Sequence, residues 1–306
     1  MSTINDTHNN TWRTTLSRMS MGTPITRGGL SIFPVFSNSV GGRPVRSGVD
    51  AIADGSVVLK ERNGGEVPAL VAISESTVPV LFPQGDTVVG GRQDRTLNVS
   101  VLLDVGESVI PVSCVEAGRW HEDGSFSHGG ALAPRRVRRV ASDSVAARAH
   151  GDLGRQSDQG AVWSAIDVEL HRTGTRSESR AVRDLHRDDN VAVRELIELG
   201  PLPGQIGVVV ARGQRILGAE LFSTPELLKS YWSSVIGSYT VDIGRSFRSY
   251  PSATRALRFL DRISRSEGVD TRGVGLGEER HVRTDRVVAH ALSWEGELIH
   301  LAGFAR

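Results

Sequence analysis

Hairpins, rather than single strands, alternate with the helices that this sequence predicts. Residues 56–61 and 67–73 have the composition of strands and flank Asn63-Gly64, a pair that suits the positive φ angles of a two-residue turn. The same pattern recurs around Gly213 and around residues 294–297. Helices that stand between hairpins favour an α+β fold over a doubly wound parallel sheet.

The first third of the chain is expected to be an antiparallel β region. Glycine makes up 34 of the 306 residues, about 11% against a typical ~7%, and its lack of a repeat indicates many tight turns. In residues 96–104, Leu97, Val99 and Val101 alternate with Asn98 and Ser100, which predicts a half-buried strand. Further strands are expected over residues 30–36, 77–82, 87–90, 108–116, 206–211, 216–222, 287–293 and 298–304.

Helices are expected where apolar residues recur every three to four positions. Ser157 or Asp158 can cap a helix on which Gln159, Trp163 and Ile166 share one face. The other expected helices cover residues 134–150, 177–199, 252–266 and a segment that begins at 223–226 with the spacing of a capping box. The chain thus has a β-rich first part, then helices and hairpins, and it closes with strands.

The domain organisation follows from where this patterning starts. Residues 1–29 are polar and lack periodicity, so we expect a disordered tail there and a single domain over 30–306. A boundary near residue 130 or near residue 200 is the alternative. No apolar run approaches the ~18–20 residues of a membrane span, and the first residues lack the apolar stretch of a signal peptide, so we expect a cytoplasmic protein.

Charge and cysteine content exclude several classes of protein. Lys and Arg number 36 against 35 Asp and Glu, so the composition gives no reason to expect a nucleic-acid or membrane-surface partner. A single cysteine, Cys114, excludes an intramolecular disulfide framework and a cysteine-rich zinc module. No phosphate-binding loop, nucleophile elbow or helical zinc motif occurs, and no metal site is predicted.

The densest polar and aromatic stretch is residues 110–120, where a strand runs into a glycine-containing turn. Glu116 can act as a general acid or base if burial raises its pKa, Arg119 can clamp an anion, and Trp120 can stack on a base or a sugar. The alternative is an internal ion pair between Glu116 and Arg119, covered by a packed tryptophan.

Two further segments carry candidate ligand contacts. In Gly90-Gly-Arg-Gln-Asp-Arg95, paired glycines can let main-chain N–H groups approach an anion beside the arginines, or the segment is a polar turn before a strand. Gln159 can contact a ligand at a helix N-terminus or satisfy a neighbouring main-chain group.

The remaining chemically capable residues have plainer interpretations. Cys114 lies in an apolar strand, where a free cysteine behaves as a small hydrophobic residue. His300 lies on the last apolar strand and is expected in the core or at its rim, and the loop with His121 and His128 is expected to be solvated. The basic run at residues 134–139 is expected to be a solvated helix face.

Several of these segments, taken in order, resemble the ARG and rhodanese-phosphatase-superfamily-associated protein (ARPP) domain family. The resemblance spans about residues 30–304, and its most distinctive part is Val112-Ser-Cys-Val-Glu116 with the following Arg119-Trp120. This chain departs from the family pattern at Asp94, where Asn is expected, and at Gly91, where a small residue such as Ala is expected. The motif residues that carry over are Gln93, Arg95, Asn98, Ser113, Cys114, Glu116, Arg119, Trp120, Gln159, Trp163 and His300.

The family name implies a link to NAD or ADP-ribose metabolism. The leading hypothesis is therefore a protein that binds or processes a nucleotide-derived small molecule, with Glu116 as acid or base. Arg95 and Arg119 would hold the anionic part, Trp120 or Trp163 would stack, and polar groups would be oriented by Gln93, Asn98 and Gln159. The second hypothesis is a non-catalytic binding or interaction module beside an enzyme, with a protein partner. The sequence identifies no cofactor.

Overall fold

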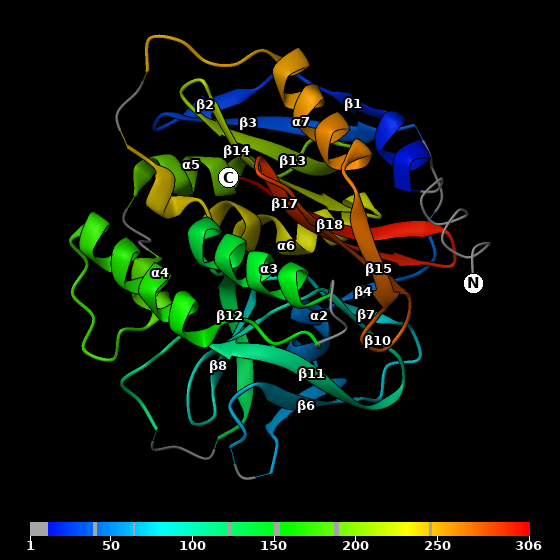
Figure 1. Cartoon of the computed structure of the whole chain (residues 1–306), viewed down its shortest axis with the longest axis vertical. Helices are drawn as coiled ribbons and strands as arrows, with labels where there is room; N and C mark the ends of the chain where they lie inside the picture. Colours follow the sequence, from blue (N-terminus) through cyan, green and yellow to red (C-terminus); the bar gives the residue numbers. More distant parts are fainter. Residues whose placement is uncertain are drawn as a thin grey trace.

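The computed structural model describes residues 12–38, 42–63, 65–120, 124–149, 154–186, 190–244 and 247–306 (Figure 1). The described helices include α2 (Gly48–Ala53), α3 (Arg135–Ala149), α4 (Gln159–Thr173), α5 (Val191–Leu199), α6 (Pro225–Gly237), α7 (Ala253–Arg265) and the 3₁₀ turns η1 (Val182–Leu185) and η2 (Thr240–Asp242). The strands are β1 (Met19–Met21), β2 (Ile25–Arg27), β3 (Leu30–Ser37), β4 (Arg46–Ser47), β5 (Val57–Glu61), β6 (Ala69–Ser74), β7 (Val80–Phe82), β8 (Asp86–Gly90), β9 (Arg95–Leu97), β10 (Val101–Leu103), β11 (Gly106–Cys114), β12 (Phe126–Leu132), β13 (Gln205–Arg212), β14 (Arg215–Phe222), β15 (Gly268–Arg272), β16 (Glu278–Arg283), β17 (Val287–Trp294) and β18 (Glu297–Ala305).

These strands form three sheets, and the architecture is α+β, as predicted. The largest has the order β1-β3-β13-β14-β18-β17-β16-β15, with β2 also paired to β3. A six-stranded sheet has the order β12-β8-β9-β11-β6-β5, and a three-stranded one has the order β10-β7-β4. Neighbouring strands are antiparallel except for β4 and β7. Among the described residues, no helix is both long enough and apolar enough to cross a membrane.

Both faces of the nine-stranded sheet are covered, which explains the continuous apolar run in β13. Val209 and Ala211 face the core that includes α7, whereas Val208 and Val210 face the core that includes α6. Successive side chains of a strand point to opposite faces, so a strand buried on both sides must be apolar throughout. Figure 1 shows α7 and α6 on opposite sides of the sheet.

The hairpins and most helices match the sequence prediction. β5 pairs with β6, β13 with β14 and β17 with β18, each in antiparallel register. Gly64 of the first turn lies outside the described residues. Asp158 caps α4, Thr224 caps α6 and Ser252 caps α7, each by accepting a hydrogen bond from a main-chain N–H of the first turn.

The disordered tail predicted over residues 1–29 is wrong for part of its length. β1 and β2 both pair with β3, and Trp12 and Leu16 pack into the core beneath α7. Strands of three residues are too short to show periodicity, so composition alone does not reveal them. Residues 1–11 lie outside the described residues.

The half-buried strand predicted over residues 96–104 is two strands in two sheets. β9 pairs with β8 and β11, whereas β10 pairs with β7. The polar side of the pattern is also buried, because Asn98 and Ser100 bond to side chains and main chain from other parts of the fold. The alternation of apolar and polar residues therefore separates a hydrophobic core from a buried polar network here, and not core from solvent.

The helix predicted over residues 177–199 is also wrong in its first half. Ala181 forms an isolated bridge with Glu116, and the N–H of Val182 donates to the carbonyl of Val115 (2.9 Å). This stretch thus lies along the end of β11, and among its described residues only η1 and α5 are helical. The contact brings a segment over sixty residues away in sequence against the predicted site.

Candidate functional site

Two buried carboxylates lie together just beyond the paired ends of β9 and β11. Arg95 pairs with Cys114, and the N–H of Val115 donates to the carbonyl of Asp94 (3.0 Å). This register places Asp94 beside Glu116, whose Oε2 accepts from the main-chain N–H of Asp94 (3.3 Å). Both carboxylates are buried.

Two arginines hold this pair. Arg119 donates from Nε to Glu116 Oε2 (2.8 Å) and from Nη2 to Asp94 Oδ1 (2.9 Å). Arg183 reaches Glu116 Oε1 (2.8 Å) and Asp94 Oδ2 (3.2 Å), and Ser179 Oγ donates to Glu116 Oε1 (2.9 Å). We call Asp94, Glu116, Arg119, Ser179 and Arg183 the carboxylate–arginine cluster. Arg183 is its outward member, with 47% of the side chain exposed.

The glycine pair before Asp94 serves the cation rather than an external anion. The carbonyls of Gly90 and Gly91 accept from Arg119 (3.3 and 2.8 Å), and the N–H of Gly90 donates to Asp94 Oδ1 (3.2 Å). Gly91 has φ +52°, and a Cβ there would lie 2.3 Å from the ring of Phe126. The φ angle and the close ring of Phe126 favour glycine at position 91, and the N–H of Gly90 is taken by Asp94 rather than left for an external anion.

The two carboxyl groups have pKa values displaced in opposite directions. Burial raises the pKa of Asp94, and the neighbouring charge of Glu116 raises it further. Burial also acts to raise the pKa of Glu116, but hydrogen bonds from Arg119, Ser179 and the Asp94 N–H outweigh it, so this pKa is lowered. The sequence hypothesis required a raised pKa at Glu116; the raised one belongs to Asp94.

A cavity of about 10 Å³ lies beside Asp94, between β8, η1 and Arg183. That volume is roughly what one water molecule occupies. The lining residues are Thr87, Val89, Asp94, Val115, Val182, Arg183 and His186.

Arg95 and Gln93 form a separate buried pair. Arg95 donates to the side-chain and main-chain oxygens of Gln93 (both 3.2 Å), and its Nη2 lies 3.6 Å from Glu61 Oε2. Arg95 has no exposed surface. A guanidinium group enclosed in this way cannot touch an external ligand unless the fold opens, so this geometry does not support the ligand contact predicted for Arg95.

Gln159 and Asn98 bond to the protein itself. Gln159 accepts from the N–H of Cys114 and donates to its carbonyl (both 2.9 Å). Asn98 accepts from Ser113 Oγ (2.6 Å) and donates to the carbonyl of Arg155 (3.1 Å). For Gln159 this favours the alternative in which the amide satisfies a neighbouring main-chain group.

The two tryptophans lie in different surroundings. Trp120 is 42% exposed, and the Arg92 guanidinium lies 5.7 Å from its ring centroid. Trp163 packs on the core between α3 and α4. Trp120 is therefore the indole with an open face, and residues 121–123 next to it lie outside the described residues.

Cys114 is buried and has the properties of a core residue. Burial raises the pKa of its thiol to about 11, so the thiol stays protonated near neutral pH. A protonated, enclosed thiol is a poor nucleophile.

A second buried polar network crosses the molecule between α3 and the nine-stranded sheet. His300 bonds to Ser100 Oγ (2.7 Å) through Nδ1 and to Glu220 Oε1 (2.9 Å) through Nε2, and Arg138 forms a two-pronged ion pair with Glu220. His300 is thus a core histidine, as predicted. The solvated face predicted for residues 134–139 is wrong at Arg138, which is enclosed, and at Arg135, which pairs with Asp242 (3.0 Å).

The order Ser100–His300–Glu220 has the donor pattern of a hydrolytic triad, but the serine is enclosed. Ser100 Oγ also accepts from the N–H of Gln84 (3.1 Å), and none of the three side chains is exposed. A nucleophile must reach its substrate. The network is best explained as a set of mutually satisfied buried groups.

Three groups of the metal-ligating type, Glu279, His281 and His290, also lie within 4.8 Å of one another. Both oxygens of Glu279 accept from Arg155 (2.8 and 2.9 Å), and His290 Nε2 accepts from the N–H of Ser100 (2.9 Å). A histidine that accepts through Nε2 carries its proton on Nδ1 when neutral. Hydrogen bonds engage Glu279, His281 Nε2 (2.9 Å to Glu279 Oε2) and His290 Nε2, whereas His290 Nδ1 is buried without a partner among the described residues.

The predicted site residues are thus gathered around the ends of β9 and β11, but in separate local networks. Sequence reasoning missed Ser179 and Arg183, because only the bridge between Glu116 and Ala181 brings their segment to the site. It also missed the role of Asp94, which it noted only as a departure from a family pattern. The available signal was that Asp94 lies just before one expected strand and Glu116 lies at the end of another.

The fold and the site together define a class: an α+β protein in which two arginines hold a buried pair of carboxylates. The sequence model of the ARG and Rhodanese-Phosphatase-superfamily-associated Protein domain matches residues 18–304. The chain therefore belongs to this family. No curated protein and no solved structure matches it.

Proposed function

We propose that the carboxylate–arginine cluster binds and processes a nucleotide-derived anion such as ADP-ribose. The observation that carries the proposal is the buried pair Asp94 and Glu116, held together by Arg119 and Arg183. In this setting the pKa of Asp94 is raised by burial and the pKa of Glu116 is lowered by its hydrogen bonds. Two carboxyl groups separated in this way can act as proton donor and proton acceptor at the same pH. Perturbed carboxyl groups of this kind are more frequent at functional sites than elsewhere.

The assignment of roles changes from the one expected from sequence. Asp94 is the proton donor and Glu116 the acceptor. Arg119 has its donors engaged with Glu116, Asp94 and two carbonyls, so it positions the carboxylates rather than the ligand. Arg183, half-exposed and bridging both carboxylates, is the arginine that an anionic ligand would engage, and Trp120 would stack on its base.

The family name supports an NAD-linked or ADP-ribose-linked role by association. The cytoplasmic location stays a prediction. The second candidate is the non-catalytic binding or interaction module. It is favoured by the small cavity at Asp94 and by the saturated hydrogen bonding of Arg119 and Gln159. In that case the cluster is a closed network that fixes the loop after β11.

Ligand-induced stabilisation and turnover separate the two candidates. The purified protein is heated with ADP-ribose, NAD or a phosphosugar, and product formation is followed in parallel. We expect stabilisation by ADP-ribose and slow hydrolysis. Asp94→Asn and Glu116→Gln should each lower the rate roughly a hundredfold or more, as expected for loss of an acid–base group, while the folded protein retains binding.

Arg183→Ala tests ligand binding better than Arg119→Ala, because Arg119 also donates to the carbonyls of Gly90 and Gly91 and so supports the loop itself. Arg176→Ala, an exposed arginine on the same segment, is the matched control. Binding should be lost in the Arg183 variant alone. If none of the ligands stabilises the protein, the module is the better description; if Asp94→Asn and Glu116→Gln turn over ligand normally, the acid–base assignment is wrong.

A further inference from the structure

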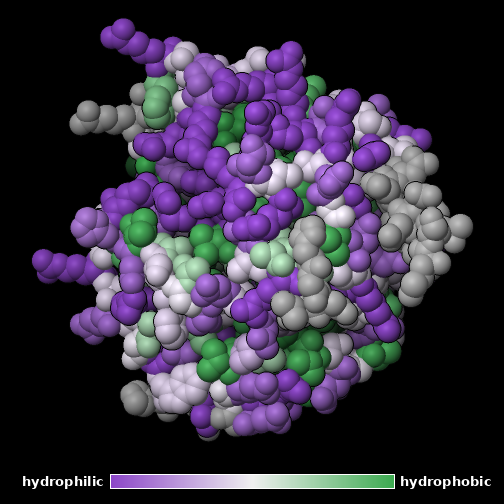
Figure 2. Space-filling view, viewed as in Figure 1, coloured by the Kyte–Doolittle hydropathy of each residue, from purple (hydrophilic) through white to green (hydrophobic). Residues whose placement is uncertain are grey.

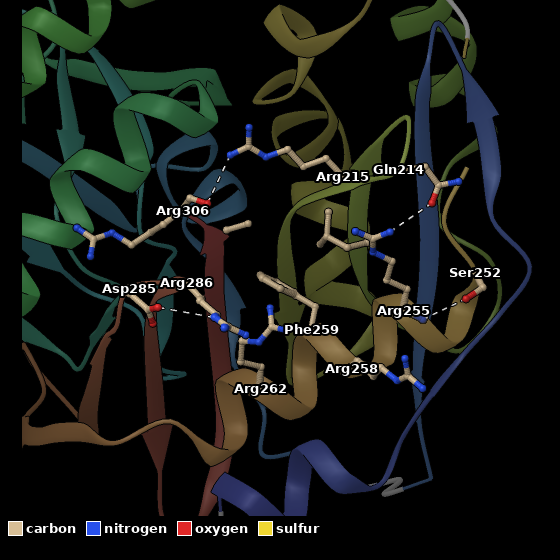
Figure 3. Close-up of a pocket in the computed structure, with 12 residues that line it drawn as sticks. Gln214, Arg215, Ser252, Arg255, Arg258, Phe259, Arg262, Asp285, Arg286 and Arg306 are labelled. Atoms are coloured by element: carbon tan, nitrogen blue, oxygen red, sulfur yellow. Dashed lines mark hydrogen bonds and ion pairs between the residues drawn. The ribbon is translucent and has the colours of Figure 1, made fainter. Parts of the chain in front are cut away.

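A groove of about 920 Å³ lies on the outer side of α7, away from the carboxylate–arginine cluster, and shares no residue with it. It runs between α7, the start of β14, the turn from β16 to β17 and the end of β18 (Figure 3). Among the described residues that line it, Asp285 is the only acidic one. Its cationic lining residues, which we call the arginine groove, are Arg215, Arg255, Arg258, Arg262, Arg286 and Arg306.

The pattern of α7 explains why three of these arginines lie along one side of the helix. Phe259, Leu260 and Ile263 bury the inner face of the helix against the nine-stranded sheet. Arg255, Arg258 and Arg262 stand at i, i+3 and i+7, so they form one stripe beside that apolar face. Figure 3 shows Arg262 from α7 and Arg286 from the β16–β17 turn reaching toward the same space.

Part of this positive charge is neutralised within the protein, because Arg306 pairs with Asp143 (2.6 Å). Arg258 and Arg262 have no acidic partner among the residues that the structure describes. Arg286 lies 3.7 Å from Asp285, and both side chains are mostly exposed. By contrast, Arg265 on the same helix points outside the groove and pairs with Asp261 (2.7 Å).

The concentration of charge is notable because the whole chain carries a formal charge of only +1. Figure 2 shows hydrophilic side chains over the face that carries α7. Exposed like charges on neighbouring helical turns repel one another, so an anion in the groove would relieve a repulsion that is built into α7.

We propose that the arginine groove is a binding site for a compact anion that carries several phosphate groups. Guanidinium groups bind phosphate oxygens in a two-pronged geometry, and several of them around one space favour a ligand with more than one phosphate. The volume is in the range of small-molecule sites. Phe259 and Ile216 form a buried floor. The described part of the chain places no exposed aromatic side chain in the lining, which therefore offers no stacking platform of the kind typical of single-strand nucleic-acid sites.

Titration calorimetry with inorganic tripolyphosphate tests this site without knowledge of the natural ligand. The full-length protein should bind tripolyphosphate more tightly than inorganic phosphate, with an affinity that falls as salt rises. The double variant Arg258→Gln/Arg262→Gln should bind at least roughly tenfold more weakly, because it loses charge-assisted hydrogen bonds. Arg265→Gln, on the same helix but outside the groove, is the control and should bind as the wild type does.

The competing outcomes are distinct. Equal affinity for phosphate and tripolyphosphate, or an unchanged affinity in the double variant, would show that the groove is not a polyphosphate site. Tighter binding of a single-stranded oligonucleotide than of tripolyphosphate would also overturn the proposal and assign the surface to nucleic acid. Because Asp94→Asn and Glu116→Gln leave the groove intact, failure of the proposed function would not alter these results.

Discussion

Gln159 fastens the start of α4 to the end of β11 through both polar groups of its side chain. Its amide replaces the neighbouring strand that the main chain of Cys114 would otherwise need, since both the N–H and the carbonyl of Cys114 bond to it. A main-chain group left without a partner in the interior costs free energy, so this one side chain has a large structural effect.

Gln159→Leu should therefore lower the free energy of unfolding by about 1–3 kcal/mol, because it leaves the N–H and carbonyl of Cys114 without partners. Urea denaturation followed by fluorescence measures the change. Gln156→Leu is the control, since Gln156 is exposed just before α4, and it should shift stability by no more than about 0.5 kcal/mol. Equal effects of the two substitutions would mean that the amide of Gln159 does not support β11.

At the scale of single residues, the sequence could predict which residue types lie near one another along the chain. It could not predict the hydrogen-bond partners that come from distant segments. Glu116 and Arg119 are three positions apart and do bond to one another. The direction of the Glu116 pKa depends on Ser179 and on the Asp94 N–H, which the fold supplies from elsewhere. Arg138 was misplaced for the same reason, because its partner Glu220 lies on a distant strand.

Among the elements, α7 was predictable from its local sequence, and it also carries arginines at spacings where like charges repel. Ser252 caps it and its apolar positions recur at helical spacing, so local information sufficed. The strands over 96–104 and the segment before α5 were not predictable in this way. There the pairing partners β7 and β11, rather than local periodicity, decide the conformation.

Within α7, Arg258 lies three residues after Arg255 and four before Arg262, and like charges at these spacings destabilise a helix. Arg258→Gln should raise the free energy of unfolding by about 0.2–0.5 kcal/mol at low salt, and the gain should vanish at high salt. Arg265→Gln should have the opposite sign, because it removes the ion pair with Asp261. Paired denaturation curves at two salt concentrations provide the comparison; destabilisation by Arg258→Gln would show that Arg258 has a stabilising contact instead.

At the scale of the whole molecule, buried polar groups connect segments that are far apart in the sequence. Arg138, Glu220 and His300 lie where α3 covers the nine-stranded sheet, and His290 bonds to the main chain of Ser100. The hydrophobic cores could be anticipated from periodicity. This layer could not, because its members come from distant segments and are recognisable only once the sheets are assembled.

The pH dependence of folding should report this interior. Burial lowers the pKa of His290 well below its ordinary value, and the neighbouring His281, His300 and Arg155 lower it further. The pKa of His300 is also lowered, because burial outweighs its bond to Glu220. The unfolded chain therefore takes up protons below about pH 6.5 that the folded chain resists, so stability present above that pH is lost as the pH falls.

His128 acts in the opposite direction. Burial alone would lower its pKa, but Asp86 more than compensates and the pKa is raised, so the stabilisation from this pair is present at acid pH and is lost as the pH rises through the raised value. A wild-type profile therefore sums contributions of both signs, and a variant is needed to isolate the buried histidines.

His290→Gln isolates one of them, because a glutamine carbonyl can accept from the Ser100 N–H but does not titrate. The variant should be less stable than the wild type at about pH 8, and its free energy of unfolding should fall less steeply between about pH 6.5 and pH 5. The wild-type slope contains up to about 1.4 kcal/mol per pH unit from each such proton. Denaturant unfolding at a series of pH values gives both slopes. Parallel slopes would mean that His290 is protonated in the native protein with little cost, and the hydrogen bond to Ser100 would then have to be reassigned.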